Sequence, residues 1–290
     1  MRSFCQLILF SVFLIKYSSS KYIFCTSKCS KIIVPFNKSL WIPVACQENT
    51  DIYDIALICT VHYRIDYDAK HVYIDFIASN DTNNVREPYQ TEFLIQTVWL
   101  GFNEQSGQPN ITDRQYECNT QNDCARLFYL STIQRLITDG KLQLDEIRSK
   151  LYKSRLPTNK SKHYYCKDNS KRGNKSAVIC KSGLCSADNT NMEQHCAKDN
   201  SPTLFSNIEY HVPRLIKHEK EVIQYKCNKN LCNKNDMIVI INQHLRNYTY
   251  WYNMRDDRSI PIATKSLTIC RTVPYYLVIL SSLFCFHVNI

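Results

Sequence analysis

Hydrophobic and polar residues alternate along two neighbouring stretches in the first half of the chain, residues 56–67 and 71–79. Both stretches are rich in Val, Ile, Tyr and Phe, which favour β-strands, and the three residues between them suffice for a hairpin turn. The alternation predicts an inward face made of Cys59, Val61, Tyr63 and Ile65. The residues between them, Thr60, His62, Arg64 and Asp66, are expected to face water.

A third strand and two helices are predicted to follow this hairpin. The strand is expected at residues 93–102, before a polar segment. A helix is expected to begin at Asp123, as its N-cap, and to stop at Gly140. Its apolar stripe consists of Leu130, Ile133 and Ile137. A second, short helix is predicted at residues 143–152.

The segment around residues 154–163 has the composition of a linker. Pro157 blocks helix continuation, and polar residues follow it. The roughly 240 residues between the two ends of the chain are enough for two domains of ordinary size. The sequence therefore predicts a β-rich disulfide domain with C-terminal helices over residues 21–157 and a second small β domain over residues 158–236.

The N-terminus has the pattern of a secretory signal peptide. Met1 and Arg2 precede an apolar run over residues 4–15, and Ser18 and Ser20 occupy the small-residue positions of a cleavage site. A bilayer span needs about twenty apolar residues, which this run does not supply. Residues 1–20 are therefore expected to be removed as the protein is exported.

The C-terminus has the pattern of a glycosylphosphatidylinositol (GPI) anchor signal. Residues 273–288 lack Asp, Glu, Lys and Arg, and the last cation, Arg271, precedes them. A cleaved signal is predicted over residues 267–290, behind a stalk over residues 237–266. The candidate attachment positions are Ser259, Ala263 and Ser266. A minimal single membrane span is the alternative.

The cysteine content agrees with export. Of fifteen cysteines, Cys5 leaves with the signal peptide, and Cys270 and Cys285 leave with the anchor signal. The remaining twelve divide evenly between the halves: Cys25, Cys29, Cys46, Cys59, Cys118 and Cys124, then Cys166, Cys180, Cys185, Cys196, Cys227 and Cys232. An oxidising compartment would convert them into six disulfides, each worth about 2–4 kcal/mol. Six cysteines allow fifteen pairings, so the pairing in the first half stays open.

Glycan acceptors and positive charge are spread along the chain. Six Asn-x-Ser/Thr sequons predict glycosylation at Asn37, Asn80, Asn110, Asn159, Asn174 and Asn247. The formal net charge is +10, and the cations are densest at residues 160–175. This cluster could meet an anionic glycan, a lipid headgroup or an acidic partner, although a solvated loop explains it as well. Export argues against a nucleic-acid partner.

The second half carries six cysteines in a distinctive order. Four residues separate Cys180 from Cys185 and also Cys227 from Cys232, and Asn233 follows directly. Over residues 164–233 this spacing resembles the three-finger fold of the Ly-6/uPAR and snake-neurotoxin families. The resemblance implies three disulfides: Cys166 with Cys185, Cys180 with Cys196, and Cys227 with Cys232. It also implies that Asn233 ties the C-terminal end to the disulfides, while the first half resembles no family.

Hairpins suit this interpretation. Residues 164–180 predict a first finger with a polar tip, and residues 203–212 and 219–227 predict the strands of a long third finger. The second finger, around residues 186–195, is short. The chain has no cysteine between Cys196 and Cys227, although the family usually brackets its third finger with a further disulfide. The apolar run at residues 236–245 is expected to pack back on a domain or to add a strand.

Catalytic and metal sites find little support in the sequence. Close cysteine pairs could bind zinc, but such thiols oxidise in the secretory pathway. We find no Gly-x-Ser-x-Gly and no His-Glu-x-x-His motif. The remaining candidates are His62, His71 and His195 as bases and Asp66, Asp68 and Asp75 as a carboxylate cluster. Exposed or packed side chains explain the histidines better than a catalytic role does, and polar residues on a wet strand face explain the aspartates equally well.

The sequence therefore predicts a mainly β, disulfide-rich chain without cofactor or metal, at the extracellular face of the plasma membrane. We expect a non-enzymatic, GPI-anchored glycoprotein that recognises an extracellular protein or glycan through hairpin tips. The contact residues are predicted to be Lys171, Arg172, Asn174, Arg214, Lys217 and His218. The alternatives are a secreted or membrane-tethered hydrolase with its site in the first half, and a structural coat or adhesion protein.

Overall fold

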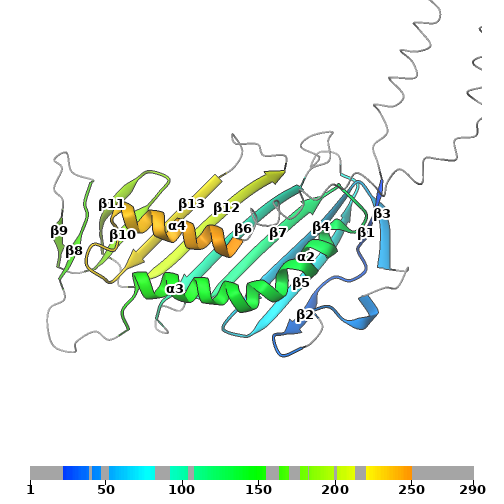
Figure 1. Cartoon of the computed structure of the whole chain (residues 1–290), viewed down its shortest axis with the longest axis horizontal. Helices are drawn as coiled ribbons and strands as arrows, with labels where there is room; N and C mark the ends of the chain where they lie inside the picture. Colours follow the sequence, from blue (N-terminus) through cyan, green and yellow to red (C-terminus); the bar gives the residue numbers. More distant parts are fainter. Residues whose placement is uncertain are drawn as a thin grey trace, which may run out of the picture. The chain divides into compact units, whose positions relative to one another are not determined.

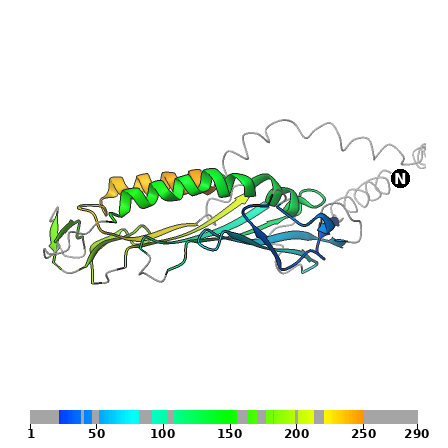
Figure 2. The ribbon, with the colours of Figure 1, turned by 90° about the horizontal axis from the view of Figure 1, so that it is seen from below.

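A nine-stranded antiparallel sheet with helices on one face forms the centre of the molecule (Figures 1 and 2). The structure, a computed structural model, describes residues 22–38, 41–46, 52–81, 92–103, 108–154, 163–169, 177–181, 183–198, 201–212 and 220–249. The strand order is β11-β10-β13-β12-β6-β7-β4-β5-β2. Two smaller sheets have two strands each, β1 with β3 and β8 with β9.

The elements have the following bounds. The strands of the large sheet are β2 (Ile32–Pro35), β4 (Ile58–Asp66), β5 (His71–Ser79), β6 (Glu92–Gly101), β7 (Ile111–Cys118), β10 (Leu184–Asp188), β11 (Glu193–Ala197), β12 (Thr203–Val212) and β13 (Lys220–Cys227). The small sheets comprise β1 (Ile23–Thr26), β3 (Tyr53–Ala56), β8 (Tyr164–Cys166) and β9 (Val178–Cys180). The helical segments are η1 (Val44–Cys46), α2 (Cys124–Arg135), the π-helical turn η5 (Leu136–Gly140), α3 (Lys141–Leu151) and α4 (Asn235–Thr249).

The predicted class is confirmed: the chain is mainly β and rich in disulfides. The hairpin predicted from the alternating pattern is β4 with β5. Its inward residues, Cys59, Val61, Tyr63 and Ile65, are each at most 1% exposed. Of the four residues expected to face water, His62 and Arg64 are exposed and Asp66 is half-buried, whereas Thr60 is buried. The alternation therefore identified both the strand and the side of it that meets the helices.

The sheet continues across the predicted boundary between the two halves. Strand β12 pairs with β6 over ten residues, from Thr203 opposite Gly101 to Val212 opposite Glu92. This ladder satisfies backbone groups that would otherwise leave an open edge on each half. The segments 21–157 and 158–236, predicted as separate domains, thus share one sheet.

Several elements differ from the sequence prediction, which includes no strand at β1, β2, β3 or β7. Strand β7 was not predicted, because polar residues occupy it at successive positions and one of them, Arg114, is fully buried. The apolar run at residues 236–245 does pack back, but as helix α4 rather than as a strand. Its buried residues Ile241, Leu245 and Tyr248 recur at helical spacing.

The predicted helix signals are only partly right. Asp123 precedes α2, but it has a positive φ of 54° and its side chain makes no capping bond. Gly140 does not stop the helix, because it lies in η5 with a helical φ of −61° and the chain continues into α3. Of the predicted stripe, Ile133 is buried and Leu130 is exposed.

Aromatic packing explains which face of α2 is buried. Phe128 stacks on Tyr116 of β7 with ring centroids 3.7 Å apart, and Tyr129 meets the edge of the Tyr63 ring at 5.1 Å. Tyr129 lies one turn before Ile133 on the same helix face, whereas Phe128 lies on the side of the helix opposite Leu130. Aromatic contacts with the sheet therefore set the rotation of the helix.

A buried arginine ties helix α4 to the centre of the sheet. The Arg114 guanidinium donates to Gln96 Oε1 at 2.7 Å, to the Tyr63 hydroxyl at 3.1 Å and to the carbonyl of Thr249. A cation is favourable beside the carbonyl groups that end a helix. The neighbouring Tyr248 hydroxyl donates to Thr112 Oγ1 at 2.7 Å. This network fixes the C-terminal end of α4.

We predict that Gly140→Val destabilises the protein. A Cβ atom at Gly140 would lie 2.7 Å from Cε2 of Tyr248, whose ring is buried and cannot withdraw easily. Overpacking of this kind costs about 1–3 kcal/mol. Chemical denaturation measures the loss, with Thr138→Val on the exposed side of the same turn as the control, expected to change stability by less than about 0.5 kcal/mol. Equal stability of the two variants would contradict the close contact between Gly140 and the Tyr248 ring.

Candidate functional site

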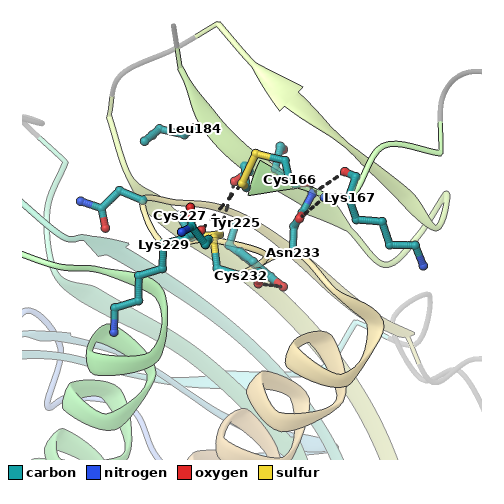
Figure 3. Close-up of a disulfide and its surroundings, with 12 residues drawn as sticks. Cys166, Lys167, Leu184, Tyr225, Cys227, Lys229, Cys232 and Asn233 are labelled. Carbon is teal, nitrogen blue, oxygen red and sulfur yellow. Dashed lines mark hydrogen bonds between the residues drawn. A yellow bond between two sulfur atoms is a disulfide. The ribbon is translucent and has the colours of Figure 1, made fainter. Parts of the chain in front are cut away.

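Three disulfides lie at one end of the second half and form what we call the hub. Figure 3 shows its surroundings at Cys166, Cys227 and Cys232. The three disulfides join Cys166 to Cys185, Cys180 to Cys196, and Cys227 to Cys232. Cys185 on β10 lies directly opposite both Cys196 on β11 and Cys227 on β13. The hub therefore joins the bases of β8–β9, β10–β11 and β13, and its pairs are those that the family resemblance implied.

Asn233 connects the hub to two hairpins. Its Oδ1 accepts a hydrogen bond from the backbone N–H of Lys167 at 2.9 Å, and its Nδ2 donates to the carbonyl groups of Lys167 at 2.8 Å and Ser186 at 3.0 Å. Figure 3 shows Asn233 beside Lys167. The side chain is fully buried, so all three bonds are shielded from water.

A buried glutamine continues this network. The Gln194 Nε2 donates to the Asn233 carbonyl at 2.6 Å and to Asn235 Oδ1 at 2.7 Å. Lys167 Nζ donates to the same Asn235 oxygen at 3.1 Å. Because Asn235 begins α4, these bonds place the start of that helix against the hub.

Two further asparagines, in the short loop between Cys227 and Asn233, bond to other parts of the fold. Asn228 accepts from the Lys153 N–H at 2.7 Å and donates to the Lys153 carbonyl at 3.0 Å, just beyond the end of α3. Asn230 Oδ1 accepts from the Tyr165 N–H at 3.2 Å. Sequence reasoning missed both roles, although the clustering of asparagines between Cys227 and Asn233 was a visible signal.

The chemistry of the hub is structural. Its sulfur atoms are paired and its amides bond to backbone groups, so neither offers a nucleophile or a base. The Tyr225 hydroxyl donates to the Cys232 carbonyl at 3.0 Å, and burial raises the pKa of Tyr225 above its ordinary value. The tyrosine therefore stays protonated and acts as a donor. The hub holds hairpins, and any recognition falls to surfaces away from it.

The first half contains the other three disulfides. They join Cys25 to Cys59, Cys29 to Cys46, and Cys118 to Cys124. The Asp123 carboxylate, next to the last of these, accepts from the Thr26 N–H at 3.0 Å and from the Thr26 hydroxyl at 2.7 Å. The sequence alone had left this pairing open.

The candidate carboxylates of the first half serve turns and loops. Asp66 Oδ1 accepts from the N–H groups of Asp68 and Ala69, at 3.0 and 2.8 Å, in the hairpin turn. The Asp68 carboxylate accepts from the backbone and side-chain nitrogens of Asn110, at 2.9 and 2.7 Å. Asp75 lies on β5 opposite His62. Two of the three carboxylates are thus occupied by structural hydrogen bonds.

The remaining sequence-based candidates lie apart from one another. His71 begins β5, and His195 lies on β11, at the other end of the strand order. Within the part of the chain that the structure describes, no group of three or more His, Cys, Asp or Glu side chains could hold a metal ion. No helix of the described residues is long and apolar enough to cross a membrane.

The structure describes four of the six sequon asparagines. Asn37, Asn80 and Asn247 are exposed, whereas Asn110 is half-buried and bonded to Asp68 and Arg148. Asn159, Asn174, the anchor positions Ser259, Ala263 and Ser266, and the tip residues Lys171, Arg172, Arg214, Lys217 and His218 lie outside the described residues.

We predict that Asn233→Ala lowers the free energy of unfolding by about 2–4 kcal/mol, because it removes three hydrogen bonds that a fully buried side chain makes to the backbone of Lys167 and Ser186. Asn230→Ala removes one hydrogen bond at an exposed residue and should cost about 1 kcal/mol. Denaturation of the oxidised proteins compares them. Similar losses for both variants would show that Asn233 does not organise the hub.

A second prediction concerns Glu221, which joins β13 to α4. Burial opposes its ionisation, but hydrogen bonds from Arg246 and Tyr210 and the charge of Arg246 lower its pKa on balance below 4.5. The stability that this carboxylate contributes is present above the unfolded pKa and is lost as pH falls through the lower folded pKa. Glu221→Gln should therefore cost about 1.5–3 kcal/mol at pH 7 and progressively less below about pH 4.5.

Glu209→Gln is the matched control for this measurement, because Glu209 lies 4.0 Å from an exposed lysine and should contribute less than about 1 kcal/mol. Urea denaturation at several pH values gives both profiles. A loss for Glu221→Gln that does not change with pH would contradict the assigned role.

Comparison of the chain with protein-family models, with curated proteins and with solved structures gives no match. The geometry of the hub and of the sheet therefore carries the functional argument.

Proposed function

We propose that this chain is an exported, non-enzymatic surface glycoprotein that recognises an extracellular protein or glycan. The observation that carries the proposal is the hub: three disulfides and Asn233, which join strands β8, β9, β10, β11 and β13 at one end. Buried disulfides of this number are typical of small domains that work in an oxidising compartment. Rigidly rooted loops are a common scaffold for binding.

The proposal includes a three-finger arrangement for residues 164–233. Three features support it: the separate hairpin β8–β9, the adjacent order β11-β10-β13, and the three disulfide pairs. One feature departs from a free-standing finger, since β12 pairs with β6 along its length. The third finger is therefore held in the sheet, and its loop is the part left for contact.

The hydrolase alternative draws less support from the site. Asp66 and Asp68 accept hydrogen bonds from their own turn and from Asn110, which leaves them poorly placed to share a substrate. A coat or adhesion role uses the same surface features as recognition. It differs in having no discrete ligand, so a binding experiment separates the two.

We predict that the protein captures a specific extracellular partner through its loop tips. The immobilised chain should retain the same partner from an extracellular fraction in repeated experiments, and a variant with Lys171, Arg172, Arg214 and Lys217 changed to Ala should lose it. The control removes exposed cations from the helices instead, as Arg135→Ala with Lys141→Ala. Equal capture by both variants would exclude the tips, and hydrolytic activity in pure material would favour the alternative.

The proposed lipid anchor has its own measurement. A phosphatidylinositol-specific phospholipase should release the protein from the surface of expressing cells, whereas a single membrane span would keep it there. Detection of Cys285 in the mature protein would contradict cleavage of the C-terminal signal.

A further inference from the structure

The two halves of the large sheet have the same strand order when they are followed outward from the β6–β12 ladder. One side runs β6-β7-β4-β5, with β2 as an additional edge strand, and the other runs β12-β13-β10-β11. Each half also has a separate small sheet whose first strand contains its first cysteine, β1–β3 and β8–β9. Figure 1 shows these small sheets at opposite ends of the large one.

A short sequence repeat coincides with this topology. Residues 115–119 read Gln-Tyr-Glu-Cys-Asn, and residues 224–228 read Gln-Tyr-Lys-Cys-Asn. Each motif ends a strand of the same rank, β7 or β13. In each half an asparagine also precedes the next cysteine by two positions, Asn122 and Asn230.

Matching hydrogen bonds follow from the repeat. The Phe24 N–H donates to Asn122 Oδ1 at 3.1 Å, and the Tyr165 N–H donates to Asn230 Oδ1 at 3.2 Å. Phe24 and Tyr165 each precede the first cysteine of their half. Their carbonyl groups accept from the N–H groups of Asp123 at 2.6 Å and Leu231 at 2.5 Å.

The backbone conformation and the disulfides agree as well. Asp123 and Leu231 have positive φ angles of 54° and 55°. Cys25–Cys59 and Cys166–Cys185 have the same Cα–Cα distance, 5.2 Å, and Cys118–Cys124 and Cys227–Cys232 share 6.2 Å. Within the sheet, Cys59 faces Cys118 just as Cys185 faces Cys227.

We infer that the chain is a tandem duplication of one disulfide-rooted unit, and that the strand of each unit at the junction, β6 or β12, is a pairing surface for the other copy of that unit. Register supports the symmetry. Ile95 lies opposite Gln115 and Phe205 lies opposite Gln224, so Ile95 and Phe205 are equivalent. Two residues on, Thr97 and Asn207 are equivalent and also directly paired. A pseudo-two-fold axis therefore passes between them.

Each unit has one disulfide without a counterpart in the other, Cys29–Cys46 in the first and Cys180–Cys196 in the second. Ile55 pairs with Phe24 as Ile179 pairs with Tyr165, so the next residues, Ala56 and Cys180, are equivalent. Ala78 pairs with Cys59 as Cys196 pairs with Cys185. The disulfide Cys180–Cys196 thus corresponds to two alanines in the first unit.

These alanines lie beside a direct contact between their strands. The Leu57 N–H, one residue beyond Ala56, donates to the carbonyl of Ser79, one residue beyond Ala78, at 3.1 Å. In the second unit, the equivalent cysteines have Cα atoms 5.6 Å apart, inside the usual disulfide range. If the units are copies, the first unit has the geometry for the same bond.

The test introduces Ala56→Cys and Ala78→Cys together in the full chain. During secretion, the two thiols should lose two protons and two electrons to a disulfide-carrying oxidoreductase and form a seventh disulfide. Alkylation of the denatured, unreduced protein should then label no more thiols than in the parent, and peptide mapping should recover residues 56 and 78 cross-linked. Two additional labelled thiols would overturn the equivalence.

The control pair, Ala56→Cys with Ile77→Cys, places the second cysteine on the opposite face of β5 and should leave two labelled thiols. If the first double variant is not secreted, Cys180→Ala with Cys196→Ala gives a second measurement. The second unit should then fold without this disulfide, as the first one does, with its other two disulfides unchanged on the map. Rearranged pairing there would overturn the duplication.

The pairing surface is tested by cutting the intact protein. A specific protease sequence placed at residues 156–161 allows cleavage between the units, and each described disulfide lies within one unit. The two pieces should co-elute in native buffer and separate in denaturant without reductant. Separation in native buffer would show that the β6–β12 ladder is no pairing surface in its own right.

Discussion

The antiparallel ladder between β6 and β12 is the interaction on which the rest of the molecule depends. Ten residue pairs join five strands of the first half to four strands of the second half in one sheet. This sheet carries the continuous helical run α2–η5–α3, with α4 beside α3. Either half alone would expose a long unpaired edge. The helices then cross the junction: α3 ends against Asn228 of the second half, and α4 ends against Arg114 of the first. The ladder and the helices therefore hold the two halves together, since none of the disulfides among the described cysteines joins one half to the other.

Within each half, stability comes from a different source. Small β units bury too little apolar surface to offset the loss of chain entropy, and disulfides compensate by restricting the unfolded chain. Short polar side chains also stabilise each half here, since Asn233 and Asp123 each accept a hydrogen bond from the backbone N–H just after the first cysteine of their half. An amide and a carboxylate thus perform a related function in the two halves, although they occupy opposite sides of the last cysteine.

Local pattern predicted what depends on local chemistry. Alternation found β4 and β5, and β-branched runs found β6, β12 and β13, because each of these strands buries one apolar face. The pattern failed at β7, where buried Arg114 interrupts the alternation, and at Gly140, where Tyr248, distant in sequence, explains the glycine. The asparagine roles around the hub also depend on distant backbone groups. The repeated Gln-Tyr-x-Cys-Asn motif was readable from the sequence, but the loops after it differ by one residue and the Cys180–Cys196 bond lacks a counterpart.

Each described disulfide joins two cysteines of the same half, and this has a consequence for how the protein folds during synthesis. The longest of these loops joins residues 34 positions apart, so under the export that we propose each half can complete its disulfides soon after its own residues reach an oxidising compartment. The first half is then covalently finished while β12 has yet to be made, and β6 waits as an unprotected edge. Two nascent chains at this stage carry the same edge and could pair with each other. Synthesis of the second half, rather than disulfide formation, is thus the step that decides whether β6 pairs with β12 of its own chain or with another nascent chain.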